Sequence, residues 1–163
     1  MPTIRTATMV HEGANRFATT TGTGRSFAWG DDASVPELGP METVTVALGA
    51  CSAMDVISIA AKKRQTMTSY QVHVEGTQRD EYPQVLTRVD VTHEVEGPGI
   101  VEAAIRRAIE LSATKYCPVN AMLSAGATEV HHRYVIRSTG RSPFEAKGEV
   151  VVTGPYRRPD PIV

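Results

Sequence analysis

The chain has 163 residues and a formal net charge of −1, with 41% hydrophobic and 21% charged residues. These values are typical of a single globular domain with an ordinary core, and they exclude an intrinsically disordered chain. The near-neutral charge, without a basic block, argues against nucleic acid as a partner. Because the N-terminus lacks the apolar run of a signal peptide, we expect a cytoplasmic protein.

The N-terminal part of the chain is predicted to form strands. Residues 3–10 and 15–29 alternate apolar with polar side chains, and glycine-containing breaks interrupt the alternation. A period of two with such breaks predicts three short antiparallel strands. Residues 30–39 then read as a loop, after which Pro40 suits the first turn of a helix.

The stretch from Pro40 to Arg64 is the longest apolar segment of the chain. From Val44 to Ala61 it contains one acidic residue, Asp55, and no basic residue. A helix that is apolar on every side is buried in a core or in a membrane. Its apolar length of about 18 residues reaches only the lower limit for a membrane span. Polar residues also interrupt it, so we expect a central core helix that is shared with a partner subunit.

The second half of the chain is predicted to alternate between strands and helices. Residues 68–80 and 85–96 show a period of two and predict a second hairpin. Apolar residues at helical spacing predict a helix over residues 100–114. A short helix is expected to open at residues 116–120 and to end near Gly126.

The last elements complete the expected fold. Residues 127–138 predict one more strand, and the remaining residues 139–163, which hold four of the ten prolines, are expected to form a C-terminal extension of one domain. Within this extension, Glu149–Thr153 fits an edge strand. The order of strands, helix, strands, helices and strand predicts an α+β fold with antiparallel sheet.

Two cysteines are the candidate reactive residues. Cys117 lies at the expected start of a short helix. A position at a helix start lowers the pKa of a thiol from about 8.5 toward roughly 3.5–7.5. Cys51 lies in the middle of the long helix, and a carboxylate at Asp55, one turn further on, would oppose its ionisation. Arg16 and Arg25, in the predicted N-terminal strands, are the cations that we nominate to neutralise this cluster.

The same residues also fit a plainer interpretation. Free cysteines are often small buried side chains without reactivity. His131 and His132 are neighbours in a predicted strand and therefore face opposite ways, so they cannot both bind one metal ion. The sequence accordingly indicates no metal or cofactor site.

The segment LGACSAMDVISIAAKKR, followed by a hairpin and then KYCPVNAML, resembles the OsmC/Ohr family of osmotically inducible and organic hydroperoxide resistance proteins. Its G-x-C-[ST]-A-x-D-V pattern is similar to the OsmC-like branch, and the resemblance runs from about Pro40 to Arg137. It implies an OsmC-like homodimer of intertwined subunits. Antiparallel sheets would wrap around long central helices, with sites at the subunit interface.

The resemblance also implies an activity. Peroxidases of this family reduce organic hydroperoxides with the helix cysteine, here Cys51, which becomes a sulfenic acid. The second cysteine, here Cys117, resolves it to a disulfide, which a dithiol such as dihydrolipoamide reduces again. The chain would then be an organic hydroperoxide reductase, a peroxiredoxin-type thiol peroxidase of oxidative stress defence.

One departure from the family pattern concerns the activation of Cys51. The family's peroxidases carry a glutamate ten residues before this cysteine, and the glutamate holds an arginine against the thiolate. That position is Met41 here, with Glu42 beside it, and Arg16 or Arg25 would be the arginine. The departure keeps two alternatives open. One is an OsmC-like dimer without peroxidase activity that binds a small apolar or thiol ligand, and the other is a protein whose cysteines sense redox state or pack in the core.

Overall fold

The computed structural model describes residues 3–30 and 38–155, and the chain forms two compact units that divide at Val44. The first unit is a three-stranded antiparallel sheet in the order β1 (Ala7–Gly13), β2 (Arg16–Thr21) and β3 (Ser26–Trp29). This confirms the strands that the alternating N-terminal sequence predicts.

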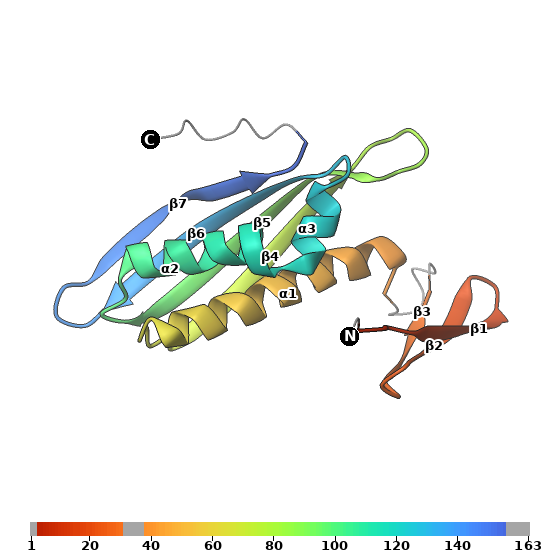
Figure 1. Cartoon of the computed structure of the whole chain (residues 1–163), viewed down its shortest axis with the longest axis horizontal. Coiled ribbons are helices and arrows are strands. Elements are labelled where there is room, and N and C mark those ends of the chain that lie inside the picture. Colours follow the sequence, from red (N-terminus) through yellow and green to blue (C-terminus); the bar gives the residue numbers. More distant parts are fainter. Residues whose placement is uncertain (1–2, 31–37, 156–163) are drawn as a thin grey trace. The chain divides into compact units, whose positions relative to one another are not determined.

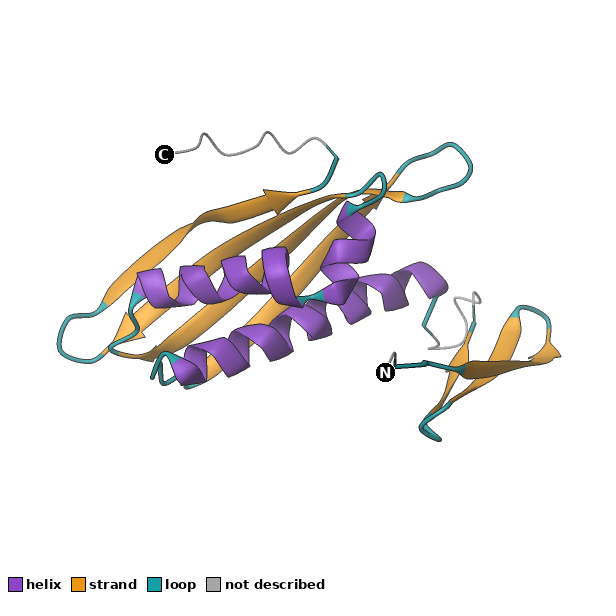
Figure 2. Ribbon diagram, in the orientation of Figure 1, coloured by secondary structure: helices purple, strands orange, loops and turns teal. Residues whose placement is uncertain are grey.

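The second unit is a four-stranded sheet with helices over one of its faces (Figures 1 and 2). The strands lie in the order β4 (Ser69–Gln78), β5 (Leu86–Pro98), β6 (Glu129–Thr139) and β7 (Phe144–Thr153). The helices are α1 (Pro40–Lys62), which begins in the first unit, α2 (Glu102–Leu111) and α3 (Pro118–Ser124). A π-helix, Ser112–Tyr116, joins α2 to α3.

The sheet of the second unit is mixed, not purely antiparallel as predicted. β4 pairs with β5 and β6 pairs with β7 in antiparallel fashion, but β5 and β6 are parallel. Parallel neighbours require a long connection, and the chain makes it through α2, the π-helix and α3. The predicted edge strand is confirmed and is longer than expected, since residues 144–153 pair with β6. The expected extension from residue 139 therefore contains a strand of the main sheet.

The two faces of this sheet carry different side chains. The face toward the helices contributes buried apolar residues, among them Val95 and Ile136, to a core shared with α1 and α2. The opposite face carries ion pairs across neighbouring strands, such as Arg133 with Asp90 at 2.9 Å. Charged side chains suit the face that no described helix covers, because one side of such a sheet meets water.

Helix α1 is buried along one stripe only. Its buried residues lie three or four positions apart, except for one adjacent pair, and are Leu48, Gly49, Ser52, Val56 and Ala60. On other sides apolar side chains are exposed, and Met54 is 73% exposed. By length and composition α1 would also suit a membrane span, but one such helix is only a weak indication of a membrane protein. Within this chain alone, the all-round burial that its composition predicts is therefore not reached.

Candidate active site

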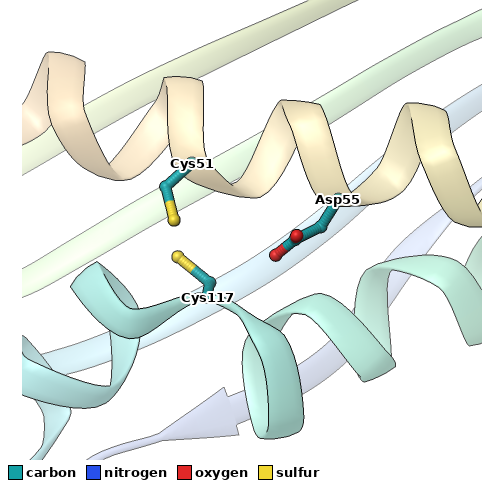
Figure 3. Close-up of side chains that lie close together, drawn as sticks. All are labelled: Cys51, Asp55 and Cys117. Atoms are coloured by element: carbon teal, nitrogen blue, oxygen red, sulfur yellow. The ribbon is translucent and has the colours of Figure 1, made fainter. Parts of the chain in front are cut away.

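Cys51, Asp55 and Cys117 lie together where α1 passes the junction between the π-helix and α3 (Figure 3). The two sulfur atoms and a carboxylate oxygen all lie within 4.8 Å of one another. Cys51 and Asp55 share one side of α1 because they are four residues apart. Both thiols are free; Cys51 is half-buried, whereas Cys117 is only 2% exposed. The fold thus brings close together two cysteines that are 66 residues apart in the sequence (117 − 51).

The π-helix sets the position of Cys117. The main-chain N–H of Cys117 donates to Ser112 O, five residues earlier, at 2.9 Å. Pro118 has no N–H and suits the first turn of the next helix, so Cys117 becomes the N-cap of α3. There its sulfur accepts the main-chain N–H of Asn120 at 3.3 Å. The predicted start of a helix at this point is confirmed, but the π-helix that precedes it was not predicted.

The expected acidity of Cys117 is wrong. Burial raises the pKa of the Cys117 thiol to about 12, and the hydrogen bond with Cys51 acts in the same direction, while the main-chain N–H of Asn120 lowers it. Loss of hydration disfavours a thiolate, and in this enclosed position it outweighs the benefit of a helix start. Cys117 is therefore a protonated thiol at neutral pH, and Cys51 is the more accessible of the two.

The carboxyl group of Asp55 is held by the element opposite α1. Ser112, the first residue of the π-helix, donates its hydroxyl to Asp55 Oδ2 at 3.0 Å, and Ser52 Oγ lies 3.3 Å from the same hydroxyl. Ser112 and Ser52 are both fully buried. The contact fixes one side of the carboxyl group and leaves Asp55 close to both sulfur atoms.

A chain of buried hydrogen bonds approaches Cys117 from beneath α1. Asn120 Nδ2 donates to Ala113 O at 2.8 Å, so Asn120 Oδ1 faces His132 Nε2 at 3.0 Å and that nitrogen carries the proton. His132 Nδ1 is then an acceptor for His93 Nε2–H at 3.4 Å. His93 Nδ1 in turn accepts the hydroxyl of Tyr70 at 2.8 Å. Every hydrogen-bond donor in this series therefore points from Tyr70 toward Asn120.

The protonation of these groups agrees with that assignment. Burial lowers the pKa of His93 to about 3 and that of His132 to about 4, so both rings are neutral at pH 7. Burial also raises the pKa of Tyr70, which keeps its proton. His131 faces the other side of the sheet, as predicted, and contacts Glu149 and Glu129 there.

The sequence did not predict His93, Asn120 or Ser112 as parts of the site, and it indicated His132 only as a candidate metal ligand. A signal for His93 was present: it occupies an inward position of its strand, and the inward residues on either side of it, Val91 and Val95, are valines. A polar ring at such a position needs a buried partner.

The remaining predicted residues lie in the first unit. Glu42 Oε2 accepts the main-chain N–H three residues before it at 2.8 Å, and it thereby caps the start of α1. Arg16 lies in β2 and pairs with Glu12 at 3.2 Å. Arg25 lies immediately before β3. The pairing of either arginine with Cys51 stays a prediction.

A groove lies along another side of α1, between this helix and β4. Its cavity volume is about 530 Å³, and most of its lining is apolar, including Val46, Ala53 and Val72. Tyr70 also lines the groove. The buried hydrogen-bond chain therefore extends from this groove, beneath α1, to the cysteine cluster.

The fold and the paired free thiols define an α+β protein with a dithiol site. Comparison with known proteins places it more closely: residues 30–133 match the family described as OsmC-like protein, and the chain belongs to this family. Protein YhfA of Escherichia coli K12 is 40% identical over 97 residues, which cover 60% of this chain and 72% of YhfA.

Solved structures share the fold. The OsmC-like protein from Mycoplasma pneumoniae matches with a TM-score of 0.73 at 15% identity, over 83% of this chain and 99% of that chain. An organic hydroperoxide resistance protein from Elizabethkingia anophelis matches with a TM-score of 0.62 at 13% identity, over 85% and 99%. At these identities the similarity concerns the fold alone.

Proposed function

We propose that this protein is a thiol peroxidase that reduces organic hydroperoxides through Cys51 and Cys117. The proposal rests on two free sulfur atoms within 4.8 Å of each other, one half-buried and one enclosed. A disulfide requires a sulfur separation of about 2.05 Å, which rotation of the two side chains can approach. Membership of a family whose fold is shared with a hydroperoxide resistance protein supports the assignment.

In the proposed reaction the more accessible thiol attacks first. Cys51 gives up its thiol proton, and its thiolate attacks the terminal peroxide oxygen, which keeps its hydrogen while the O–O bond breaks. Cys51 becomes a sulfenic acid, and the leaving alkoxide takes up the proton that Cys51 released and departs as the alcohol. Cys117 then attacks the sulfur of Cys51. We assign Asp55 to take the proton of Cys117 and to pass it to the departing hydroxide, which leaves as water. An external dithiol of the dihydrolipoamide class then reduces the disulfide, and the cytoplasm provides the reducing setting.

We also propose that the protein is a homodimer formed through the exposed apolar side of α1. Met54 and Ile57 are both exposed on this helix, close in sequence to Cys51. A second copy would cover this side and complete the burial that the composition of α1 requires. It would also turn the half-buried surroundings of Cys51 into an enclosed apolar site for a hydroperoxide.

The test is the fate of the two thiols. Fully reduced protein, treated with one equivalent of cumene hydroperoxide, is expected to lose both thiols as an intramolecular Cys51–Cys117 disulfide, which intact mass and peptide mapping detect. Cys117→Ser should stop at a sulfenic acid that dimedone traps, and Cys51→Ser should not react. Two unreacted thiols in the wild-type protein after several minutes would reject the peroxidase. They would leave an OsmC-like dimer that binds a small apolar or thiol ligand.

A further inference from the structure

We propose that the reduced cluster of Cys51, Asp55 and Cys117 binds a thiophilic divalent cation of the Zn²⁺ class through two sulfur atoms and one carboxylate oxygen. This inference goes beyond the proposed peroxidase and does not depend on it. The three side chains come from α1 and from the start of α3, and they point into one shared space (Figure 3).

The distances suit such a site. In tetrahedral zinc centres with Zn–S near 2.3 Å and Zn–O near 2.0–2.2 Å, ligand atoms lie roughly 3.5–4 Å apart. The three ligand atoms here lie within 4.8 Å of one another. Small side-chain rotations therefore bring them to the spacing that a tetrahedral cation needs.

Hydrogen bonds from outside the cluster hold two of the three ligands. Ser112 donates to Asp55 Oδ2 at 3.0 Å, and the main-chain N–H of Asn120 donates to the sulfur of Cys117 at 3.3 Å. Asn120 is itself fixed through Ala113 and is fully buried. Metal ligands in proteins are commonly oriented by such supporting contacts. These contacts therefore preorganise the ligands toward a common centre.

Charge supplies a further argument. Two thiolates and a carboxylate within 4.8 Å would repel one another. A divalent cation compensates two of three negative charges, and each protonated thiol releases its proton when the cation binds. A thiolate pair with one carboxylate is also a ligand set that favours a zinc-like ion over Mg²⁺ or Ca²⁺.

Three protein ligands leave the fourth tetrahedral position open, as in catalytic zinc sites. Half-buried Cys51 gives the ion a path into the cluster. The bound cation and a Cys51–Cys117 disulfide exclude each other, because both need the same two sulfur atoms. Metal binding would therefore protect the reduced pair, and oxidation would release the ion.

The experiment is a Co²⁺ titration of fully reduced, metal-free protein, followed by competition with Zn²⁺ and a chelator. We expect one ion per chain and a sulfur-to-cobalt charge-transfer absorption in the ultraviolet. This absorption should be lost in the oxidised protein and weakened in Cys51→Ser. Asp55→Asn keeps both thiols and should weaken Zn²⁺ binding at least tenfold. Asp80→Asn, at an exposed position between β4 and β5, is the matched control and should bind like wild type.

The proposal is overturned if reduced wild-type protein shows no charge-transfer absorption. It is equally overturned if Asp55→Asn, shown to be folded by circular dichroism, binds Zn²⁺ as tightly as wild type. Hydroperoxide oxidation of the metal-free wild-type protein, measured in parallel, separates the two proposals. Zn²⁺ binding without disulfide formation would support the metal site and reject the peroxidase, and disulfide formation without Zn²⁺ binding would reject the metal site alone.

Discussion

At the scale of single residues, His93 and His132 are fully buried, and each ring is hydrogen-bonded through both nitrogens. A neutral imidazole has one donor and one acceptor, as the chain from Tyr70 to Asn120 requires. A second proton on His132 would set a donor against the N–H of His93. The site is therefore compatible only with neutral rings, and this has a consequence for its response to pH.

We expect the free energy of unfolding to fall as the pH falls below about 6.5, the pKa of an unperturbed histidine. The folded-state pKa of His132 is lowered to about 4, so the unfolded chain takes up its proton first and the loss grows until the pH reaches that value. At roughly 1.4 kcal/mol per pKa unit, this histidine alone costs about 3 kcal/mol near pH 4.

Urea denaturation of the wild type and His132→Asn, followed from about pH 7.5 to pH 4.5, measures this effect. The variant should be less stable at neutral pH but should show a weaker dependence on pH. His73→Asn, at an exposed position of β4, is the control and should keep the wild-type profile. An unchanged pH dependence in His132→Asn would contradict a buried neutral ring.

Local spacing in the sequence predicts part of the site, but not the contacts between strands. Cys117 at a helix start and Asp55 one turn after Cys51 follow from local spacing, and the structure confirms both positions. His93 and His132 lie on neighbouring strands, 39 residues apart. Their contact depends on the register of β5 and β6, which one sequence does not determine. The acidity of Cys117 was wrong because burial, which local spacing does not show, dominates it.

At the scale of elements, the close approach of α1 to β4 depends on Gly49. This glycine is buried in the middle of the helix, and an added Cβ would lie 2.9 Å from the Cγ2 atom of Val74. Such a distance is shorter than ordinary contact, and a β-branched side chain in a strand has little freedom to move. The glycine therefore lets the helix that carries Cys51 lie directly on the sheet.

Gly49→Ala is expected to lower the free energy of unfolding. Alanine gains up to about 1 kcal/mol of helix propensity, but overpacking a core typically costs about 1–3 kcal/mol. Urea denaturation of a double-mutant cycle provides the measurement, because Val74→Ala removes the clashing atoms and should make Gly49→Ala less costly or stabilising. A more stable Gly49→Ala in the wild-type background would show that α1 does not pack this tightly.

The sequence predicted helices and strands correctly where apolar residues repeat regularly over a long enough segment. The helix from Pro40 follows from its long apolar segment. The two paired strands on either side of residues 81–85 follow from their alternation of apolar and polar residues. The parallel pairing of β5 with β6 was not predicted, since it depends on the path of the connecting helices over the sheet. The π-helix has no sequence period of its own at five residues, so the expected helix over residues 100–114 ends early, at Leu111.

At the scale of the whole molecule, the exposed apolar side of α1 predicts self-association. Size-exclusion chromatography with light scattering should give twice the mass of one chain for the wild type. Met54→Glu places a charge at a 73% exposed position of α1 and should shift the protein toward the monomer. Val101→Glu, at a 53% exposed apolar position before α2, is the matched control and should remain dimeric. A monomeric wild-type protein at micromolar concentration would contradict the proposal.

The π-helix between α2 and α3 determines the direction in which the residues that follow it face. An α-helix turns by about 100° for each residue, and a hydrogen bond that spans five residues instead of four inserts one extra residue into the turn. The direction in which Cys117 faces is thus set by the number of residues between Leu111 and Pro118. The number of residues in the π-helix therefore decides whether the two thiols face each other. A relative that kept both cysteines but lacked one residue of this turn would keep the helices, but its two thiols would no longer lie together.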